Sequence, residues 1–133
     1  MAGEATVTIK VKVTGIGEDV DVSNSVAMTV PVEVMAGYTV VDTATTVALQ
    51  LFTDVAKIAL AKVYGVYIKA EVGTIYITVD TAGTGTLTSA TADLVLNVGE
   101  ACYIPVNPGG NLGMVIDAAA VTDAFSWVIL AKV

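Results

Sequence analysis

Closely spaced oxygen side chains are the first feature of this chain that could support chemistry. Asp19, Asp21 and Ser23 occupy alternate positions, which is the spacing of the first ligands in a calcium-binding loop. An EF-hand loop continues with Gly at its sixth position and Glu at its twelfth, whereas this chain has Asn24 and Val30 there. The pattern therefore favours a solvated turn, and it leaves open a cation site of another geometry near Asp19 and Asp21.

Six further aspartates are spread through the rest of the chain. A pair of carboxylates can hydrolyse a glycosidic bond, and Asp80 and Asp93 flank a segment rich in Gly and Thr. No spacing brings these two carboxylates together, and Asp is common in turns because its side chain bonds to the local backbone. We therefore interpret the six as residues of turns and strand ends. They are Asp42, Asp54, Asp80, Asp93, Asp117 and Asp123.

The side chains that usually act as bases and nucleophiles near neutral pH are nearly absent. The chain has no His and one Cys, Cys102, and a catalytic cysteine needs a nearby base. A free Cys is more often a small buried hydrophobic residue. The Gly-rich segments 83–85 and 107–110 lack the lysine and the spacing of a phosphate-binding loop. We expect no enzyme and no cofactor, and we assign no catalytic, cofactor-binding or metal-binding residue.

Aromatic side chains suggest a different kind of site. Tyr67 and Tyr76 fall on the polar phase of their expected strands, so they could stack against a sugar. Rows of Tyr in a sheet are more often cross-strand pairs or anchors of a protein interface. The residues considered for such a platform are Tyr64, Tyr67, Tyr76, Tyr103 and Trp127.

The charge balance argues against two classes of partner. Lys and Arg number 6 against 13 Asp and Glu, which gives a formal net charge of −7, and a protein that binds nucleic acid needs clustered bases. No apolar stretch approaches the roughly 18 residues of a membrane-spanning helix, and residues 1–4 do not begin a signal peptide. We expect neither nucleic acid nor a membrane as a partner.

The apolar content exceeds what one small domain can bury. Hydrophobic residues make up 55% of the 133 residues and charged residues 14%, against about 25% charged in ordinary domains. A small domain has a large surface relative to its volume, so part of this apolar material must lie at the surface. Obligate interfaces are the usual place for it, and we expect a homo-oligomer.

Strict alternation of apolar and polar residues marks the first 35 residues, as expected for strands. One strand is predicted over 6–14 and another over 25–34, with its apolar residues inward and with Pro31 at a sheet edge or bulge, because proline lacks an N–H. We predict that 1–35 form N-terminal strands or an arm that pairs with a neighbouring subunit. The alternating residues are Val7, Ile9, Val11 and Val13, then Val26, Met28, Val30, Val32 and Val34.

Residues 47–63 fit two interpretations. Leu49 and Leu51 alternate as in a strand, and a second strand would follow at Ile58 and Leu60. The Ala-rich composition and a 3.6-residue repeat also fit a helix. Two short strands are favoured because Thr and Val dominate the approach to this segment, and the helix stays open.

Short alternating segments separated by turns continue to the C-terminus. Segment 71–74 is expected to be a hairpin in which Gly73 supplies a positive φ, and 81–91 a long contact loop. Such spacing predicts an all-β fold, a single β-sandwich or jelly-roll-like domain with an N-terminal strand or arm. Within this one domain, 36–133 would form the sandwich core. Its later strands are expected around Ile75–Val79, Leu94–Val98, Cys102–Ile104, Met114–Ile116 and Phe125–Ile129.

Three segments of the second half have the pattern of a known family. They are VYGVYIKA at 63–70, TIYITVD at 74–80 and LVLNVGEACYIP at 94–105. With the Thr-rich loop and the final aromatic strand, they resemble small virion proteins of tailed bacteriophages, in particular capsid decoration (cement) proteins. The resemblance covers about residues 60–133. It implies a compact β-sandwich, commonly a trimer, that binds the outside of the shell where capsomers meet.

The resemblance implies a structural virion protein, made in the host cytoplasm and located on the capsid surface. It would form a homotrimer and clamp subunits of the major capsid protein, with edge strands and the N-terminal arm adding to neighbouring sheets. The alternative is a carbohydrate- or receptor-binding module of a phage fibre or tail, which would expose Tyr or Trp in a concave site.

Overall fold

The computed structural model describes residues 3–15, 17–28, 30–41, 49–79, 90–106 and 113–132. Strands dominate these residues, and the chain divides into two compact units, Met1–Pro31 and Val32–Val133. The first unit contains β1 (Thr6–Val13) and β2 (Val20–Ala27). The second contains β3 (Glu33–Val40), β4 (Leu49–Gln50), η1 (Leu51–Val55), η2 (Leu60–Lys62), β5 (Val63–Val72), β6 (Ile75–Val79), β7 (Leu94–Leu96), β8 (Ala101–Pro105), β9 (Met114–Ala118) and β10 (Ala124–Ala131).

The first unit is a β-hairpin. β1 and β2 pair antiparallel from Thr6 opposite Ala27 to Val13 opposite Val20, so the predicted strand over 6–14 is confirmed. The predicted strand over 25–34 is wrong. β2 ends at Ala27 and β3 begins at Glu33, and Pro31 between them has no N–H for a ladder.

The apolar residues around this break are not inward, as predicted, but exposed. Val26, Val32 and Val34 keep 52%, 69% and 55% of their surface accessible. The division between the two units also falls earlier than predicted, after Pro31 instead of after residue 35. The reason is that Glu33 and the residues after it pair with β10 in the second unit.

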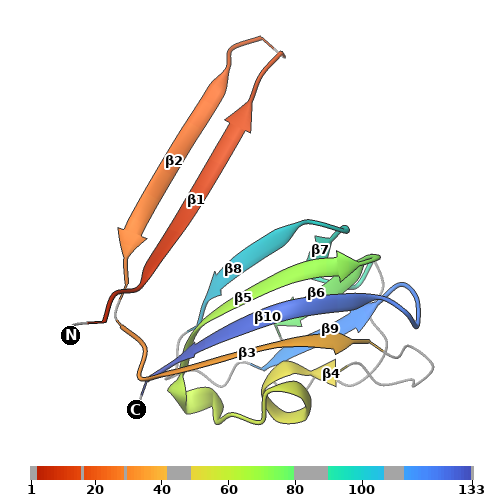
Figure 1. Ribbon diagram of the computed structural model, residues 1–133. Helices are drawn as coiled ribbons and strands as arrows, with labels where there is room; N and C mark the ends of the chain where they lie inside the picture. Colours follow the sequence, from red (N-terminus) through yellow and green to blue (C-terminus); the bar gives the residue numbers. More distant parts are fainter. Residues whose placement is uncertain are drawn as a thin grey trace. The chain divides into compact units, whose positions relative to one another are not determined.

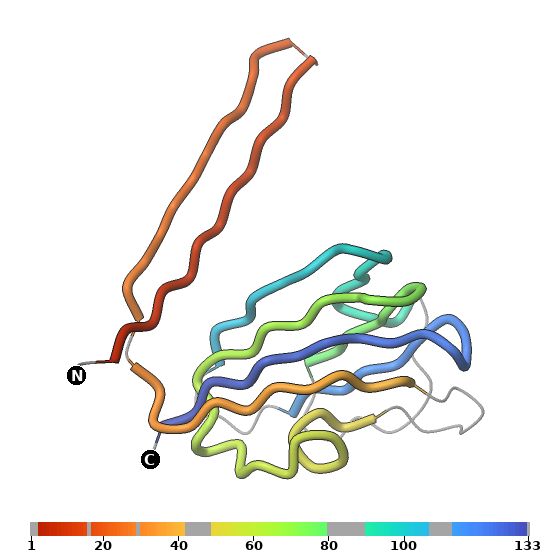
Figure 2. The backbone as a smooth tube through the Cα atoms, viewed as in Figure 1, coloured from red at the N-terminus to blue at the C-terminus, as the bar shows by residue number. Residues whose placement is uncertain are grey.

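The second unit is a jelly roll (Figure 1). Its front sheet has the strand order β3-β10-β5-β8 and its back sheet the order β4-β9-β6-β7, and all of these pairs are antiparallel. The first strand pairs with the last, the second with the second last, and so on to β6 and β7. Figure 2 shows the chain crossing repeatedly between the two sheets. This is the eight-stranded jelly roll of two packed sheets, and the predicted all-β sandwich is confirmed.

The core lies between the two sheets because alternate residues of each strand point inward. In β10, Phe125, Trp127 and Ile129 are buried while Ser126 and Val128 are half-buried. Ile68 of β5, Ile77 of β6 and Ile116 of β9 meet them from the other strands and are fully buried. The predicted strands around Phe125–Ile129, Met114–Ile116 and Cys102–Ile104 are therefore confirmed.

Trp127 lies across the backbone of β3. A Cβ on Gly37 would stand 2.6 Å from Trp127 Cζ2, so only glycine leaves room for the indole here. The Trp127 Nε1–H donates a hydrogen bond to Thr39 Oγ1 at 3.1 Å. This bond satisfies the polar atom of a side chain that is otherwise buried.

The segment 71–74 is not a hairpin, as predicted, but a crossover between sheets. β5 belongs to the front sheet and β6 to the back sheet, and the two strands do not pair. Gly73 does adopt a positive φ of 68°. Its missing side chain leaves space for the buried carboxylate of Asp123, which would touch any Cβ at this position.

Residues 49–63 form neither two strands nor a regular helix. β4 has two residues, and η1 is a single π-helical turn closed by the hydrogen bond from Ala56 N to Leu51 O at 2.8 Å. Leu51 and Phe52 are adjacent and both are buried. A strand would place neighbours on opposite faces, so the wide turn is what buries the two together. Val47 lies outside the described residues, as do Asp42, Asp80 and the segments 81–89 and 107–112.

Candidate interaction surface

The hairpin β1–β2 carries an apolar surface that we call the hairpin stripe. Directly paired residues share one face of a ribbon, and the cross-strand pairs Val11 with Val22 and Val13 with Val20 lie on this face. Ile9 is paired with Asn24, the one polar side chain of the stripe. The full stripe is Val7, Ile9, Val11, Val13, Val20, Val22, Asn24 and Val26.

The hairpin stripe is exposed over most of its length. Ile9, Val11, Val13, Val20, Val22 and Val26 each keep between 37% and 58% of their surface accessible. Residues 3–15, 17–28 and 30–31 contain no element besides the two strands. An isolated two-stranded hairpin is marginally stable in water, so covering this stripe would stabilise it.

The opposite face of the hairpin is polar. Thr8 and Ser25 lie opposite each other and share a hydrogen bond of 2.8 Å between their hydroxyls. Lys12 lies opposite Asp21, and Lys10 opposite Ser23. One ribbon therefore has a solvated face and an apolar face, which is the arrangement expected of a strand pair that lies on a partner.

The acidic residues near the hairpin tip do not converge. Asp21 belongs to β2, on the polar face, while Asp19 is exposed and precedes that strand. Among the described residues, no group of three or more His, Cys, Asp or Glu side chains is placed to hold a metal ion.

The described aspartates of the second unit bond to backbone N–H groups. Asp54 accepts from Gln50 N at 2.9 Å and Asp93 from Val79 N at 3.0 Å. Asp117 accepts from its neighbour Ala118 N at 2.8 Å. Asp123 accepts from two backbone groups, Thr74 N at 3.2 Å and Ala120 N at 3.1 Å. Asp93 and Asp123 lie between strands and Asp117 near the end of β9, as predicted, whereas Asp54 lies in η1.

Cys102 is poorly suited to act as a nucleophile. Its side chain is half-buried at the edge of the core, on β8. Burial raises the pKa of the Cys102 thiol above its ordinary value, and a hydrogen bond from the Ile68 backbone lowers it by less. The thiolate is the reactive form, so the protonated thiol is favoured here.

The aromatic residues do not form one platform. Tyr67 and Tyr103 are a cross-strand pair on the front sheet, and the ring of Tyr103 covers Gly65. Tyr76 lies on the back sheet opposite Asp117, and Trp127 is buried in the core. The sequence correctly suggested paired Tyr residues, but the strand order separates Tyr67 from Tyr76.

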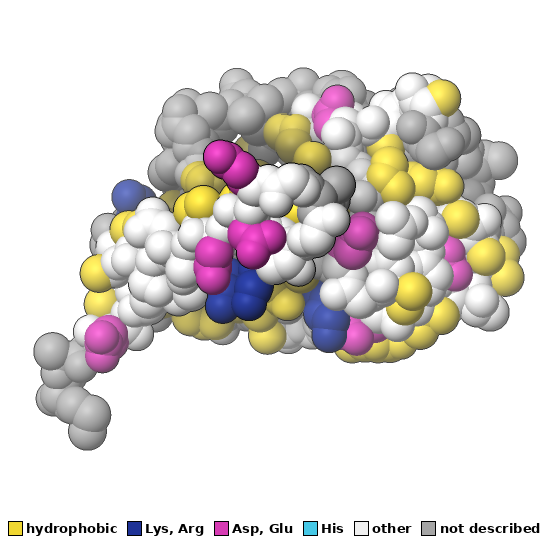
Figure 3. All heavy atoms as spheres, turned by 90° about the horizontal axis from the view of Figure 1, so that it is seen from above, with side chains coloured by type: hydrophobic (Ala, Val, Ile, Leu, Met, Phe, Trp, Pro, Cys, Tyr) yellow, Lys and Arg dark blue, Asp and Glu magenta, His cyan; other side chains and the backbone are white. Residues whose placement is uncertain are grey.

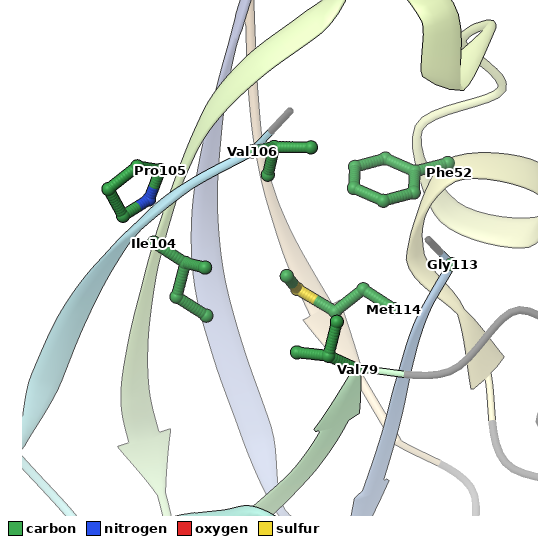
Figure 4. A pocket seen from close by; sticks show the side chains of 7 residues that line it. All are labelled: Phe52, Val79, Ile104, Pro105, Val106, Gly113 and Met114. Carbon is green, nitrogen blue, oxygen red and sulfur yellow. The ribbon is translucent and has the colours of Figure 1, made fainter. Parts of the chain in front are cut away.

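The second unit has an apolar cavity of about 30 Å³ at one end of the sandwich. Figure 4 shows Phe52, Val79 and Met114 pointing toward one another, while Pro105 points away. The described lining residues include no titratable side chain; they are Phe52, Val79, Ile104, Pro105, Val106, Gly113 and Met114. An apolar space of this size offers no group that could catalyse a reaction.

A second exposed surface, which we call the front face, was not predicted. In β3, Val34, Ala36, Tyr38 and Val40 point away from the core, and Tyr38 is 59% exposed. Of these residues only Val34 is placed from the sequence, on the inward side, and a turn is expected at Ala36 and Gly37, where β3 continues without a break. Figure 3, which views the chain from above, shows hydrophobic side chains at the surface in several places, with acidic and basic side chains among them. The other residues of the front face are Ser126, Val128, Leu130, Tyr67, Lys69, Glu71, Ala101, Tyr103 and Pro105.

Within the part of the chain that the structure describes, no helix has the length and apolar character needed to cross a membrane. Comparison of the chain with family models, with curated proteins and with solved structures found no match.

Proposed function

We propose that this chain is a structural virion protein, a capsid decoration protein of a tailed bacteriophage. The observation that carries the proposal is the hairpin stripe, an exposed apolar face on a ribbon that is marginal by itself. The jelly-roll topology is compatible with it, since viral capsid and lectin domains use this architecture. A fold alone does not establish a function, so the proposal depends on the stripe.

In this proposal the hairpin lies on subunits of the major capsid protein at the outer surface of the shell. The ribbon is eight residues long, which gives each face a projected area of about 270 Å² at ordinary strand dimensions. This is far below the ~800 Å² per partner of a standard interface. One hairpin therefore binds weakly, and several linked copies bind tightly through their effective concentration. Such avidity is the reason to propose a homo-oligomer, a trimer, as the binding form.

The chain's net charge and its described polar side chains support a binding role more than a catalytic one. The net charge of −7 disfavours nucleic acid as the partner. The described aspartates of the second unit accept hydrogen bonds from backbone N–H groups, and burial raises the pKa of the Cys102 thiol. These observations support the proposal that the chain is not an enzyme.

Co-sedimentation with shells of the major capsid protein tests the proposal. The double variant Val11→Lys/Val22→Lys places two charges on the hairpin stripe, and we expect shell occupancy to fall at least tenfold. The matched control is Ala27→Lys, which adds a charge to the polar face of the same ribbon, opposite Thr6. If the double variant bound like the control, or if the unmodified chain did not bind shells, the proposal would be wrong.

A second candidate is a carbohydrate- or receptor-binding module of a phage fibre or tail. Tyr38 and Tyr67 favour it, because both are exposed on the front face, at 59% and 37%. The pocket at the end of the sandwich does not contribute, since neither Tyr lines it. Binding to a glycan array that is lost in Tyr38→Ala would support this candidate, and an array without signal would count against it.

A further inference from the structure

The front face is a sheet surface with the properties of a protein interface. Three rows of residues cross its four strands in register. One row is Tyr103, Tyr67, Val128 and Ala36, and a neighbouring row is Pro105, Gly65, Leu130 and Val34. Tyr is enriched in interfaces, and charged residues are depleted from their centres.

The charges on the front face cancel each other. In the row with Tyr38 and Ser126, Lys69 Nζ lies 3.7 Å from Glu71 Oε2, and Ser126 Oγ donates a hydrogen bond to Glu71 Oε1 at 2.7 Å. The chain as a whole carries −7, so two copies repel each other at most surfaces. A locally neutral apolar face is where this repulsion is weakest.

The front face also reaches the size of a small protein interface. β3, β10, β5 and β8 have eight, eight, ten and five residues, which corresponds to about 500 Å² in projection at ordinary strand dimensions. Two such faces bury about 1,000 Å², the lower size of a specific protein interface. The hairpin stripe offers only about half of this area.

We propose that the front face is the surface through which copies of this chain associate. The occupant is a second copy of the chain, which packs on Val128, Leu130 and Tyr38 of the first. This deepens the proposed function, because it locates the contact of the homo-oligomer. It also separates the two surfaces, with the front face joining copies and the hairpin stripe binding the shell.

The test is the mass of the full chain in solution, measured by size-exclusion chromatography with light scattering. The unmodified chain is expected at two or three times 13.6 kDa. Val128→Lys, at the centre of the face, should raise the dissociation constant by roughly 30-fold or more, as for a central interface residue. The variant should then elute near 13.6 kDa at micromolar concentration.

Tyr38→Lys provides a second variant with little risk to folding, because Tyr38 is exposed on an edge strand. It should dissociate the oligomer in the same way. The matched control is Val98→Lys, which adds the same charge at an exposed Val in a turn outside the front face, and it should keep the mass of the unmodified chain. Near-ultraviolet circular dichroism shows that each variant is folded.

An unmodified chain that is monomeric at all concentrations would overturn the inference. So would an oligomer that persists in folded Val128→Lys and Tyr38→Lys, or one that Val98→Lys dissociates equally. None of these results depends on shells, so failure here is distinct from failure of the shell-binding proposal. Loss of glycan binding in the Tyr38 variant, with the mass unchanged, would instead assign the face to a ligand.

Discussion

Asp123 is predicted to be the residue that fixes the crossover from the front sheet to the back sheet. Its carboxylate is buried, accepts hydrogen bonds from Thr74 N at 3.2 Å and Ala120 N at 3.1 Å, and fills the space beside Gly73. Its backbone also joins the network, since Val41 N donates to Asp123 O at 2.8 Å. We therefore expect Asp123→Ala to be among the most destabilising changes at a polar residue.

The size of the effect follows from the two donors. A buried N–H that loses its acceptor costs about 1–3 kcal/mol, and both donors here are part-buried. Both bonds are long, so each donor should contribute a cost in the lower part of that range. With two donors, Asp123→Ala should lower the free energy of unfolding by about 2–4 kcal/mol. For a domain of roughly 100 residues this is a fall in Tm of about 10–20 °C. Asp93→Ala is the matched control, because Asp93 is exposed and accepts one N–H at 3.0 Å; it should cost under about 1 kcal/mol.

Urea denaturation followed by fluorescence is the assay, because Trp127 is the one Trp of the chain and is buried. A double-mutant cycle with Gly73→Ala sharpens the test. Gly73→Ala in the native background suffers both the positive φ of 68° and the contact with Asp123, whereas in Asp123→Ala only the backbone strain remains. The costs should therefore be less than additive by about 1 kcal/mol or more. Additive costs, or an Asp123→Ala variant as stable as Asp93→Ala, would refute the reasoning.

Two other predictions concern single side chains. Gly37→Ala should displace the indole of Trp127, whose Cζ2 would lie 2.6 Å from the new Cβ, and should cost about 1–3 kcal/mol; an unchanged emission spectrum and urea midpoint would contradict this packing. Alkylation of Cys102 by iodoacetamide at pH 8 should be slower in the folded chain than in urea, because burial raises the pKa of the thiol above its ordinary value and so lowers the thiolate fraction at that pH. Equal rates in both states would show that the thiol is not protected.

Strands with one buried face could be predicted from the sequence, because buried apolar residues alternate along them with less buried ones. Phe125, Trp127 and Ile129 alternate with less buried residues in β10, and the pattern was sufficient to place them inside. The prediction failed where period 2 does not hold. Leu51 and Phe52 are neighbours that are both buried in a π-helical turn, which no strand pattern represents.

Alternation alone does not show which face is covered. Val26 and Val34 alternate like core residues but are exposed. Both lie on apolar faces that the core of the second unit does not bury. Pairing between distant strands is equally invisible in the sequence, which predicts a hairpin around Gly73 where the structure has a crossover. The side chains that would mark an enzyme are scarce in the sequence, and the described aspartates of the second unit bond to backbone groups.

Imaging of shells decorated with the unmodified chain tests the central proposal most directly. A cryo-electron microscopy reconstruction should show jelly rolls on the outer surface, with density for residues 6–27 lying against major capsid subunits through the hairpin stripe. Shells without added density, or decorated shells in which the stripe faces solvent, would contradict the proposed function.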